Sequence, residues 1–245
     1  MRLLNRLAAP LLAAVLMTGG LTLSAAPAAA AAPAEQQAIR IMPLGDSLTF
    51  GKGDKTENGY RNWLFSWLTL SGVDADFVGS QSDGTGTDTG HEGHPGWRIA
   101  WLTRHVDYWM STYKPQVVLL DIGTNDLIRN QANGSTQRLG KLIDRIVAAD
   151  PDVKIVLAKL LVVKHKNARE FRAFNAKLAK VAARHPRNVT LVDMSVIPAS
   201  DTVDGVHPDQ DGYQKMAFQW YQGLRRVLPT GRSFQPVASP FTSGR

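Results

Sequence analysis

Short apolar runs rich in Val, Ile and Leu alternate with longer helical patterns from residue 38 to residue 228. This alternation is typical of a parallel sheet whose strands are each followed by a covering helix. The predicted strands are Ala38–Leu44, Ala75–Val78, Val117–Ile122, Lys154–Val162 and Val189–Val192. The predicted helices are Tyr60–Leu70, Ile99–Ser111, Ser135–Ala149, Ala168–Arg184 and Asp211–Leu228. We therefore predict an α/β fold, a three-layer α/β/α sandwich with a five-stranded parallel sheet.

The ends of the chain differ in composition from this central domain, residues 38–228. Arg2 and Arg6 precede an apolar stretch and a run of alanines with small-residue cleavage sites, the pattern of a secretory signal peptide. We assign residues 1–32 to this cleaved segment and expect a secreted protein. Pro10 and a Gly-Gly pair interrupt the apolar stretch, which argues against a stable membrane anchor. Residues 229–245 are rich in Pro, Gly and Ser, and we predict a disordered C-terminal tail.

The composition excludes several classes of function. The chain has no cysteine, so disulfides, thiolate metal sites and cysteine nucleophiles are excluded. The formal net charge of +7 falls to +5 when Arg2 and Arg6 leave with the leader. The basic residues are spread over predicted helices, whereas nucleic-acid binding needs them on one face. We expect no nucleic-acid partner and a monomer, although the sequence does not determine the oligomeric state.

Two motifs carry the elements of nucleophilic catalysis. Ser47 lies in the pentapeptide GDSLT directly after the first predicted strand, and His207 lies in DGVHP before the last predicted helix. A serine hydroxyl needs a base to remove its proton, and histidine is the usual base. An α/β sheet can bring these distant positions to one rim, beyond the carboxyl ends of its strands. A Ser-His pair needs an acid that orients the histidine ring. Asp204 is preferred for this role, and the alternatives in the same loop are Asp201, Asp209 and Asp211.

With GTND at 123–126 and HPGW at 94–97, these motifs form four blocks that resemble the SGNH (GDSL-type) hydrolases over nearly the whole mature chain. The resemblance implies a flavodoxin-like SGNH hydrolase fold and no cofactor. It also implies that Ser47 attacks an ester, that His207 takes its proton and that Asp204 orients the imidazole. The oxyanion would be bound by the Ser47 and Gly96 backbone N–H groups and by the Asn125 amide.

The segments GYR at 59–61, FVGS at 77–80 and HEGHPGW at 91–97 resemble carbohydrate esterase family three, which includes acetylxylan esterases. This resemblance implies hydrolysis of O-acetyl esters of polysaccharide through a Ser-His-Asp triad and an acyl-enzyme. The first alternative is a GDSL-type lipase or lysophospholipase that acts on lipid or short-chain esters. The remote alternative is a non-catalytic carbohydrate-binding protein. Trp97 and Trp101 are candidate substrate-binding residues, with core packing as the alternative.

The segment 91–94 also contains metal-binding residue types. His91, Glu92 and His94 lie within a glycine-rich stretch, residues 79–96, that we interpret as a long surface loop. Their spacing differs from that of the helical H-E-x-x-H zinc motif. We therefore predict no metal site, and the sequence does not determine whether the loop moves or binds a cation.

Overall fold

The computed structural model describes residues 37–163, 167–228 and 234–241. The predicted signal peptide, residues 1–32, lies outside the described residues, as do residues 229–233 and 242–245 of the predicted tail. In the part of the chain that is described, no helix combines the length and the apolar character needed to span a membrane.

The described residues form an alternating series of strands and helices. The strands are β1 (Ile39–Gly45), β2 (Ala75–Phe77), β3 (Glu92–Gly93), β4 (Val117–Asp121), β5 (Lys154–Lys159) and β6 (Val189–Asp193). The α-helices are α1 (Ser47–Phe50), α2 (Tyr60–Leu70), α3 (Ile99–Tyr113), α4 (Thr124–Ile128), α5 (Ser135–Ala149), α6 (Ala168–Asn175), α7 (Leu178–Ala182) and α8 (Gln210–Val227). Two short 3₁₀ helices, Met194–Val196 and Ala199–Asp201, precede α8.

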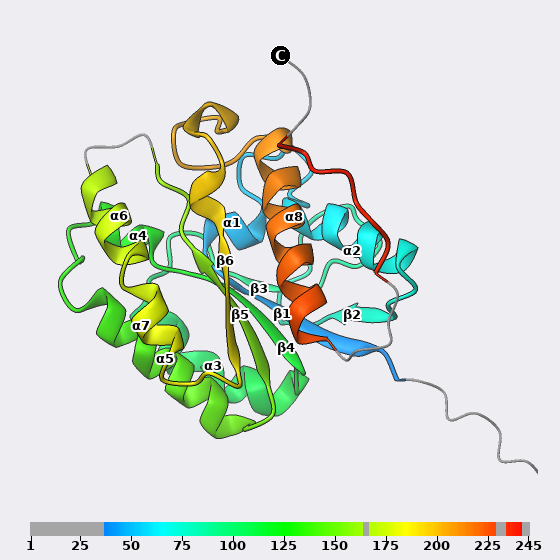
Figure 1. The fold of residues 1–245 in the computed structure, drawn as a ribbon, viewed down its shortest axis with the longest axis horizontal. Helices are drawn as coiled ribbons and strands as arrows, with labels where there is room; N and C mark the ends of the chain where they lie inside the picture. The colour runs from blue at the N-terminus through cyan, green and yellow to red at the C-terminus, as the bar shows by residue number, and fades with distance from the viewer. Residues whose placement is uncertain (1–36, 164–166, 229–233, 242–245) are drawn as a thin grey trace, which may run out of the picture. The chain divides into compact units, whose positions relative to one another are not determined.

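The strands form one parallel sheet in the order β2-β1-β4-β5-β6, with the two-residue β3 paired beside the end of β1. Helices α2 and α8 lie on one face, and α3, α5 and α7 lie on the other (Figure 1). With β3 set aside, this is the flavodoxin-like strand order. The predicted three-layer α/β/α fold is therefore confirmed, and the carboxyl ends of β1, β3 and β4 lie at one rim.

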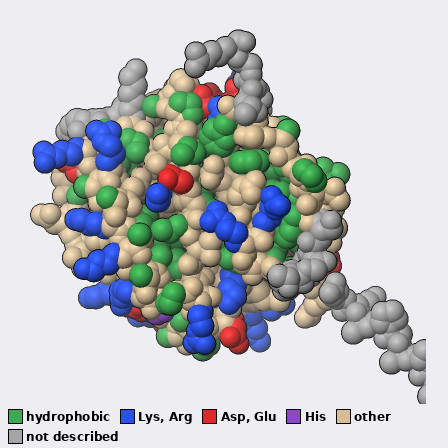
Figure 2. Space-filling model, viewed as in Figure 1, with side chains coloured by type: hydrophobic (Ala, Val, Ile, Leu, Met, Phe, Trp, Pro, Cys, Tyr) green, Lys and Arg blue, Asp and Glu red, His purple; other side chains and the backbone are tan. Residues whose placement is uncertain are grey.

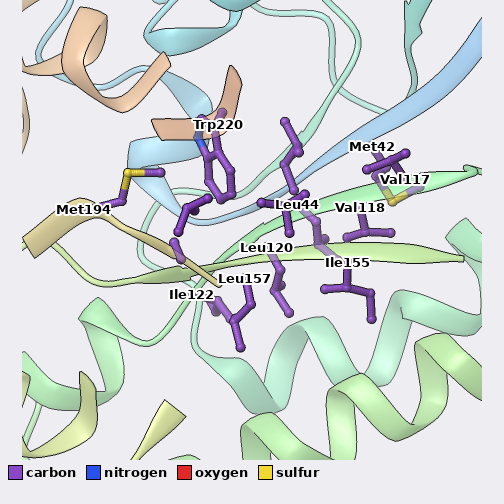
Figure 3. Packing of buried hydrophobic residues seen from close by; sticks show 14 of the residues in the cluster. Met42, Leu44, Val117, Val118, Leu120, Ile122, Ile155, Leu157, Met194 and Trp220 are labelled. Carbon is purple, nitrogen blue, oxygen red and sulfur yellow. The ribbon is translucent and has the colours of Figure 1, made fainter. Parts of the chain in front are cut away.

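The central strands form the floor of the core. Every residue of β4 is buried, and β1 is buried except at one position. Side chains of Leu44, Leu120 and Leu157 lie together on neighbouring strands, with Trp220 of α8 beside them (Figure 3). Continuous burial is expected for parallel strands that are covered on both faces. On the face shown in Figure 2, the Lys and Arg side chains are spread over several elements rather than gathered in one patch.

One polar side chain explains two differences from the predicted elements. The strand predicted over 154–162 ends at Lys159, and the helix predicted over 168–184 is divided into α6 and α7. The Asn175 amide accepts from the Leu160 N–H at 2.8 Å and donates to the Leu160 carbonyl at 2.8 Å. These bonds replace strand pairing at Leu160, and Asn175 ends α6 where it turns inward to make them.

The segment predicted as a long surface loop contains β3 and buried side chains. Glu92 and Gly93 pair with Leu44 and Gly45, and both His91 and Glu92 are fully buried. The prediction of a surface loop over 79–96 is therefore wrong for residues 91–93. The apolar periodicity is too short there to reveal a two-residue strand.

Residues 234–241 lie against α2 and α8. The Gln235 N–H donates to Ser71 Oγ at 3.0 Å, and the Gln235 carbonyl accepts from the Tyr221 hydroxyl at 2.8 Å. Phe234 packs against Tyr221, with ring centroids 5.4 Å apart. Some apolar side chains and backbone groups of residues 234–241 therefore have partners on the domain, while the disordered tail over 229–245 remains a prediction.

Candidate active site

Ser47 is the first residue of α1, directly after β1. The Asp46 carboxylate accepts a hydrogen bond from the Leu48 N–H at 3.1 Å, which caps this short helix. Gly45 is required before it, since a Cβ atom there would lie 2.2 Å from the Asp121 carbonyl oxygen. The tight turn between β1 and α1 therefore places Ser47 at the carboxyl-end rim of the sheet. The Asp46 side chain holds this turn.

The structure brings Ser47, His207 and Asp204 into one hydrogen-bonded series. Ser47 Oγ lies 3.0 Å from His207 Nε2, and His207 Nδ1 lies 2.7 Å from Asp204 Oδ2. The other oxygen, Asp204 Oδ1, accepts from the backbone N–H groups of Val206 and His207. Burial raises the pKa of Asp204, but these hydrogen bonds outweigh it, and the pKa lies below its usual value. The carboxylate is thus ready to orient an imidazole that accepts the serine proton.

The other acids of this loop have different partners. Asp209 caps α8 by accepting from the Gly212 N–H at 2.9 Å. Asp201 forms an ion pair with Lys215 of α8, and Asp211 lies in the first turn of that helix. Among the four acids that the sequence left as alternatives, Asp204 is the one placed against the His207 ring.

The two further residues assigned to the oxyanion site lie next to the serine turn. Gly96 has a φ of +79°, which favours glycine, and lies in a turn closed by the Trp97 N–H and the His94 carbonyl at 3.0 Å. Asn125 lies on α4, after β4. Its Nδ2 donates to Asp46 Oδ2 at 3.2 Å and to the Trp97 carbonyl at 3.0 Å. Asn125 therefore links the residue before Ser47 to the residue after Gly96, and these two bonds occupy its amide hydrogens.

Replacing Asn125 by Ala is expected to lower kcat by about 10²- to 10³-fold, the usual effect of removing one oxyanion donor. KM should change little, because the lost hydrogen bond forms with the transition state. Steady-state hydrolysis of p-nitrophenyl acetate checks this, with the exposed Asn133→Ala as control. A kcat within threefold of wild type would limit Asn125 to holding Asp46 and Trp97 in place.

Two buried carboxyl groups, those of Asp46 and Asp121, lie beside the turn between β1 and α1. Asp121 ends β4 and is paired in register with Gly45, and within the described residues its Oδ2 atom has no hydrogen-bond partner. Burial raises the pKa of Asp121 to about 7. Burial and the nearby charge of Asp121 also raise the pKa of Asp46. The sequence analysis did not identify Asp121, although an acid that closes a wholly apolar strand is an unusual signal.

Asp121→Asn is expected to stabilise the protein more at pH 8 than at pH 5. The folded-state pKa is raised, so folding retains a proton that the unfolded chain releases above about pH 4, and stability is lost as the pH rises towards 7. The variant's gain in the free energy of unfolding over wild type should be roughly 3 kcal/mol larger at pH 8 than at pH 5. Urea unfolding of wild type and variant at both pH values measures it. An equal difference at both values would show that Asp121 does not titrate in this range.

Arg61, in the predicted motif GYR, is a buried cation that links three loops. Its Nη1 donates to the Thr89 carbonyl at 2.9 Å, and its Nη2 contacts the carbonyls of Phe50, Glu57 and Asp83. Burial lowers the pKa of Arg61. The guanidinium therefore holds the turn after Ser47 against the segment that leads to Gly96.

The residues weighed as metal ligands bind other parts of the protein. His91 Nδ1 accepts from the Gly93 N–H at 2.9 Å, and burial lowers the pKa of His91 to about 3, which keeps the ring neutral. Glu92 lies 2.8 Å from His94 Nε2 and accepts from the Ser80 backbone N–H at 2.6 Å. Sequence reasoning treated this segment as a loop and missed the pairing of Glu92 with His94.

The two tryptophans proposed as a substrate platform differ in their surroundings. The Trp97 ring is half-buried against the core and stacks on His94, with centroids 4.0 Å apart. Trp101, on α3, is also half-buried and contacts the Trp97 ring edge to face. The Arg98 guanidinium lies 4.8 Å from the Trp101 ring centroid. Trp97, the residue after Gly96, thus has a clear packing role, and Trp101 reaches this region through its contact with the Trp97 ring.

Comparisons with known proteins agree with this geometry. Residues 44–215 match the model of the GDSL-like lipase/acylhydrolase family. A multidomain esterase of Ruminococcus flavefaciens is 32% identical over an alignment 240 residues long. The match covers 84% of this chain and 31% of that protein. The chain spans less than two thirds of the length of the curated relatives that it matches.

Solved structures give the same relationship at the level of the fold. A family 3 carbohydrate esterase of Clostridium thermocellum is 34% identical, with a TM-score of 0.71, and the match covers 78% of this chain and 97% of that one. A carbohydrate esterase family 3 protein of Talaromyces cellulolyticus is 25% identical, with a TM-score of 0.69, covering 77% and 97%.

Proposed function

We propose that this chain is a serine esterase that removes O-acetyl groups from polysaccharide. The chain belongs to the GDSL-like lipase/acylhydrolase family, and it is related to the family 3 carbohydrate esterases. The observation that carries the proposal is the series Ser47 Oγ, His207 Nε2, His207 Nδ1 and Asp204 Oδ2, with separations of 3.0 and 2.7 Å at its two hydrogen bonds. Nucleophile, base and orienting carboxylate are within direct reach of one another.

In the first half of the reaction, Ser47 Oγ attacks the acetyl carbonyl carbon while His207 Nε2 takes the hydroxyl proton. Asp204 stabilises the imidazolium through Nδ1–H. The negative charge moves to the former carbonyl oxygen, which the Ser47 and Gly96 N–H groups bind. The Asn125 amide is a third donor, for which this oxygen competes with the Trp97 carbonyl.

The tetrahedral intermediate then collapses. The bond to the sugar oxygen breaks, the proton on His207 Nε2 passes to that oxygen, and an acetyl ester remains on Ser47. A water molecule, deprotonated by His207, attacks this ester in the second half of the reaction. Acetate leaves, and Ser47 regains its proton. No metal or other cofactor takes part in these steps.

Separate observations support the proposed substrate class. The related solved proteins carry the name carbohydrate esterase. Trp97 follows Gly96 in the sequence and contacts Trp101, and a sugar ring could stack on these two half-buried rings. We further propose that residues 1–32 direct export and are removed, that residues 38–228 form the catalytic domain, and that the mature esterase acts outside the cell as a monomer.

The acyl-chain preference tests this function against the lipase alternative. Initial rates on p-nitrophenyl acetate, butyrate and octanoate should fall with chain length, because an acetyl site lacks room for further methylenes, each worth about 1 to 3 kcal/mol in a fitted pocket. A preference for octanoate would favour the lipase alternative. Absence of turnover on all three, with binding to xylan, would favour the non-catalytic carbohydrate-binding protein.

A further inference from the structure

We propose that the buried Glu92 and the partly buried His94 form a hydrogen-bonded pair that positions the oxyanion donors Gly96 and Asn125. Glu92 and His94 are therefore positioning residues for ester hydrolysis. The inference rests on the proposed function. It concerns residues to which neither the four motif blocks nor the family comparisons assign a role. Glu92 is the first residue of β3, and His94 lies between β3 and Gly96.

Glu92 is fixed from both of its carboxylate oxygens. The side chain is 0% exposed. Its Oε1 accepts from the Ser80 N–H at 2.6 Å, and its Oε2 accepts from Ser80 Oγ at 3.0 Å and lies 2.8 Å from His94 Nε2. A buried carboxylate is costly unless its oxygens are hydrogen-bonded, and here three donors meet two oxygens. The carboxylate therefore has one favourable orientation, and His94 depends on it.

His94 is held on its backbone and on its ring. Its N–H donates to the Gly45 carbonyl at 3.1 Å, two residues before Ser47. Its ring stacks against Trp97 and Trp109, with centroids 4.0 and 5.1 Å apart. Its carbonyl closes the turn that contains Gly96 by accepting from the Trp97 N–H. The position of the His94 ring therefore sets the position of this turn relative to the nucleophile.

The contacts continue from this turn to the other donor. The Trp97 carbonyl accepts from Asn125 Nδ2 at 3.0 Å, and the same Nδ2 reaches Asp46 beside Ser47. A shift of the His94 and Trp97 rings would thus move both Gly96 and Asn125. Oxyanion donors act over hydrogen-bond distances, so a displacement below 1 Å is enough to weaken them.

The test uses changes that keep the shape of the pair. In Glu92→Gln one acceptor oxygen must serve three donors, and the new NH₂ group faces either Ser80 or His94. His94→Phe keeps an aromatic ring for stacking and removes the bond to Glu92. Asp152→Asn is the matched control, because the Asp152 side chain is an exposed carboxylate away from this site. Titration with an organophosphate counts the active sites, so that kcat refers only to folded protein.

The measurements are kcat and KM for p-nitrophenyl acetate and the inhibition constant of phenylboronic acid, whose tetrahedral serine adduct mimics the transition state. Each single variant should lose about 10- to 100-fold in kcat, with KM within about twofold and a parallel rise in the boronate inhibition constant. The double variant should be no worse than the poorer single variant, because the two residues act as a unit.

A merely structural pair gives a different result. The variants would then melt at lower temperature, while kcat per titrated site and the boronate inhibition constant would stay within twofold of wild type, and the proposal would be overturned. Wild-type turnover that disappears in Ser47→Ala establishes the esterase function independently. Failure of the positioning role is thereby separated from failure of the function itself.

Discussion

Ser47→Ala is expected to lower kcat on p-nitrophenyl acetate by about 10⁶-fold, the loss seen when a serine hydrolase is deprived of its nucleophile. The reason is the contact between Ser47 Oγ and His207 Nε2 at 3.0 Å, since without the hydroxyl His207 has no proton to accept and no acyl-enzyme forms. The fold should be unaffected, because the short α1 is capped by the Asp46 side chain and not by Ser47.

Two further measurements make this prediction specific. Incubation with an organophosphate should add one adduct mass to the wild type, on the peptide that contains Ser47, and none to the variant. Ser66→Ala, an exposed serine on α2, should keep full activity. A Ser47→Ala protein that retains a tenth of the wild-type kcat would show that another group attacks the ester.

Asp204→Asn should lower kcat by about 10⁴-fold, the effect of leaving the catalytic imidazole in the wrong tautomer. Asp204 Oδ1 already accepts from the Val206 and His207 N–H groups, so the new amide nitrogen would face His207 Nδ1. His207 Nδ1 must then accept a hydrogen bond from this amide, so the ring proton moves to His207 Nε2, where it faces Ser47. The base is lost, although the geometry is nearly unchanged.

The neighbouring acids provide the controls for Asp204. Asp211→Asn should leave kcat unchanged, and Asp209→Ala should lower stability through the lost cap of α8 rather than turnover. Steady-state kinetics and thermal unfolding separate these effects. If Asp204→Asn kept most of its activity while Asp201→Asn lost it, the orienting carboxylate would be Asp201, which pairs with Lys215 in this structure.

Local pattern was sufficient to predict most of the fold. Tyr60–Leu70 and Ser135–Ala149 have the predicted bounds, because their apolar spacing and flanking glycines mark both helices clearly. The family assignment from four motif blocks is confirmed. Where a tertiary contact sets an element, the pattern failed: Asn175 bonds to Leu160 and divides the helix predicted over 168–184.

The same distinction holds for the candidate site. The order of the motifs placed Ser47, Asn125 and His207 at one rim, because parallel strands end on the same side of the sheet. The charge state of Asp121 and the pairing of Glu92 with His94 depend on burial and on contacts between distant segments. No residue spacing encodes these properties, so they required the three-dimensional structure.

The proposed function is tested most directly by the release of acetate from acetylated xylan by the wild type and by Ser47→Ala at equal concentrations of folded protein. We expect steady acetate release by the wild type and none above background by the variant. Absence of release by a wild type that hydrolyses p-nitrophenyl octanoate rapidly would contradict the polysaccharide assignment. Equal release by both proteins would contradict the role of Ser47.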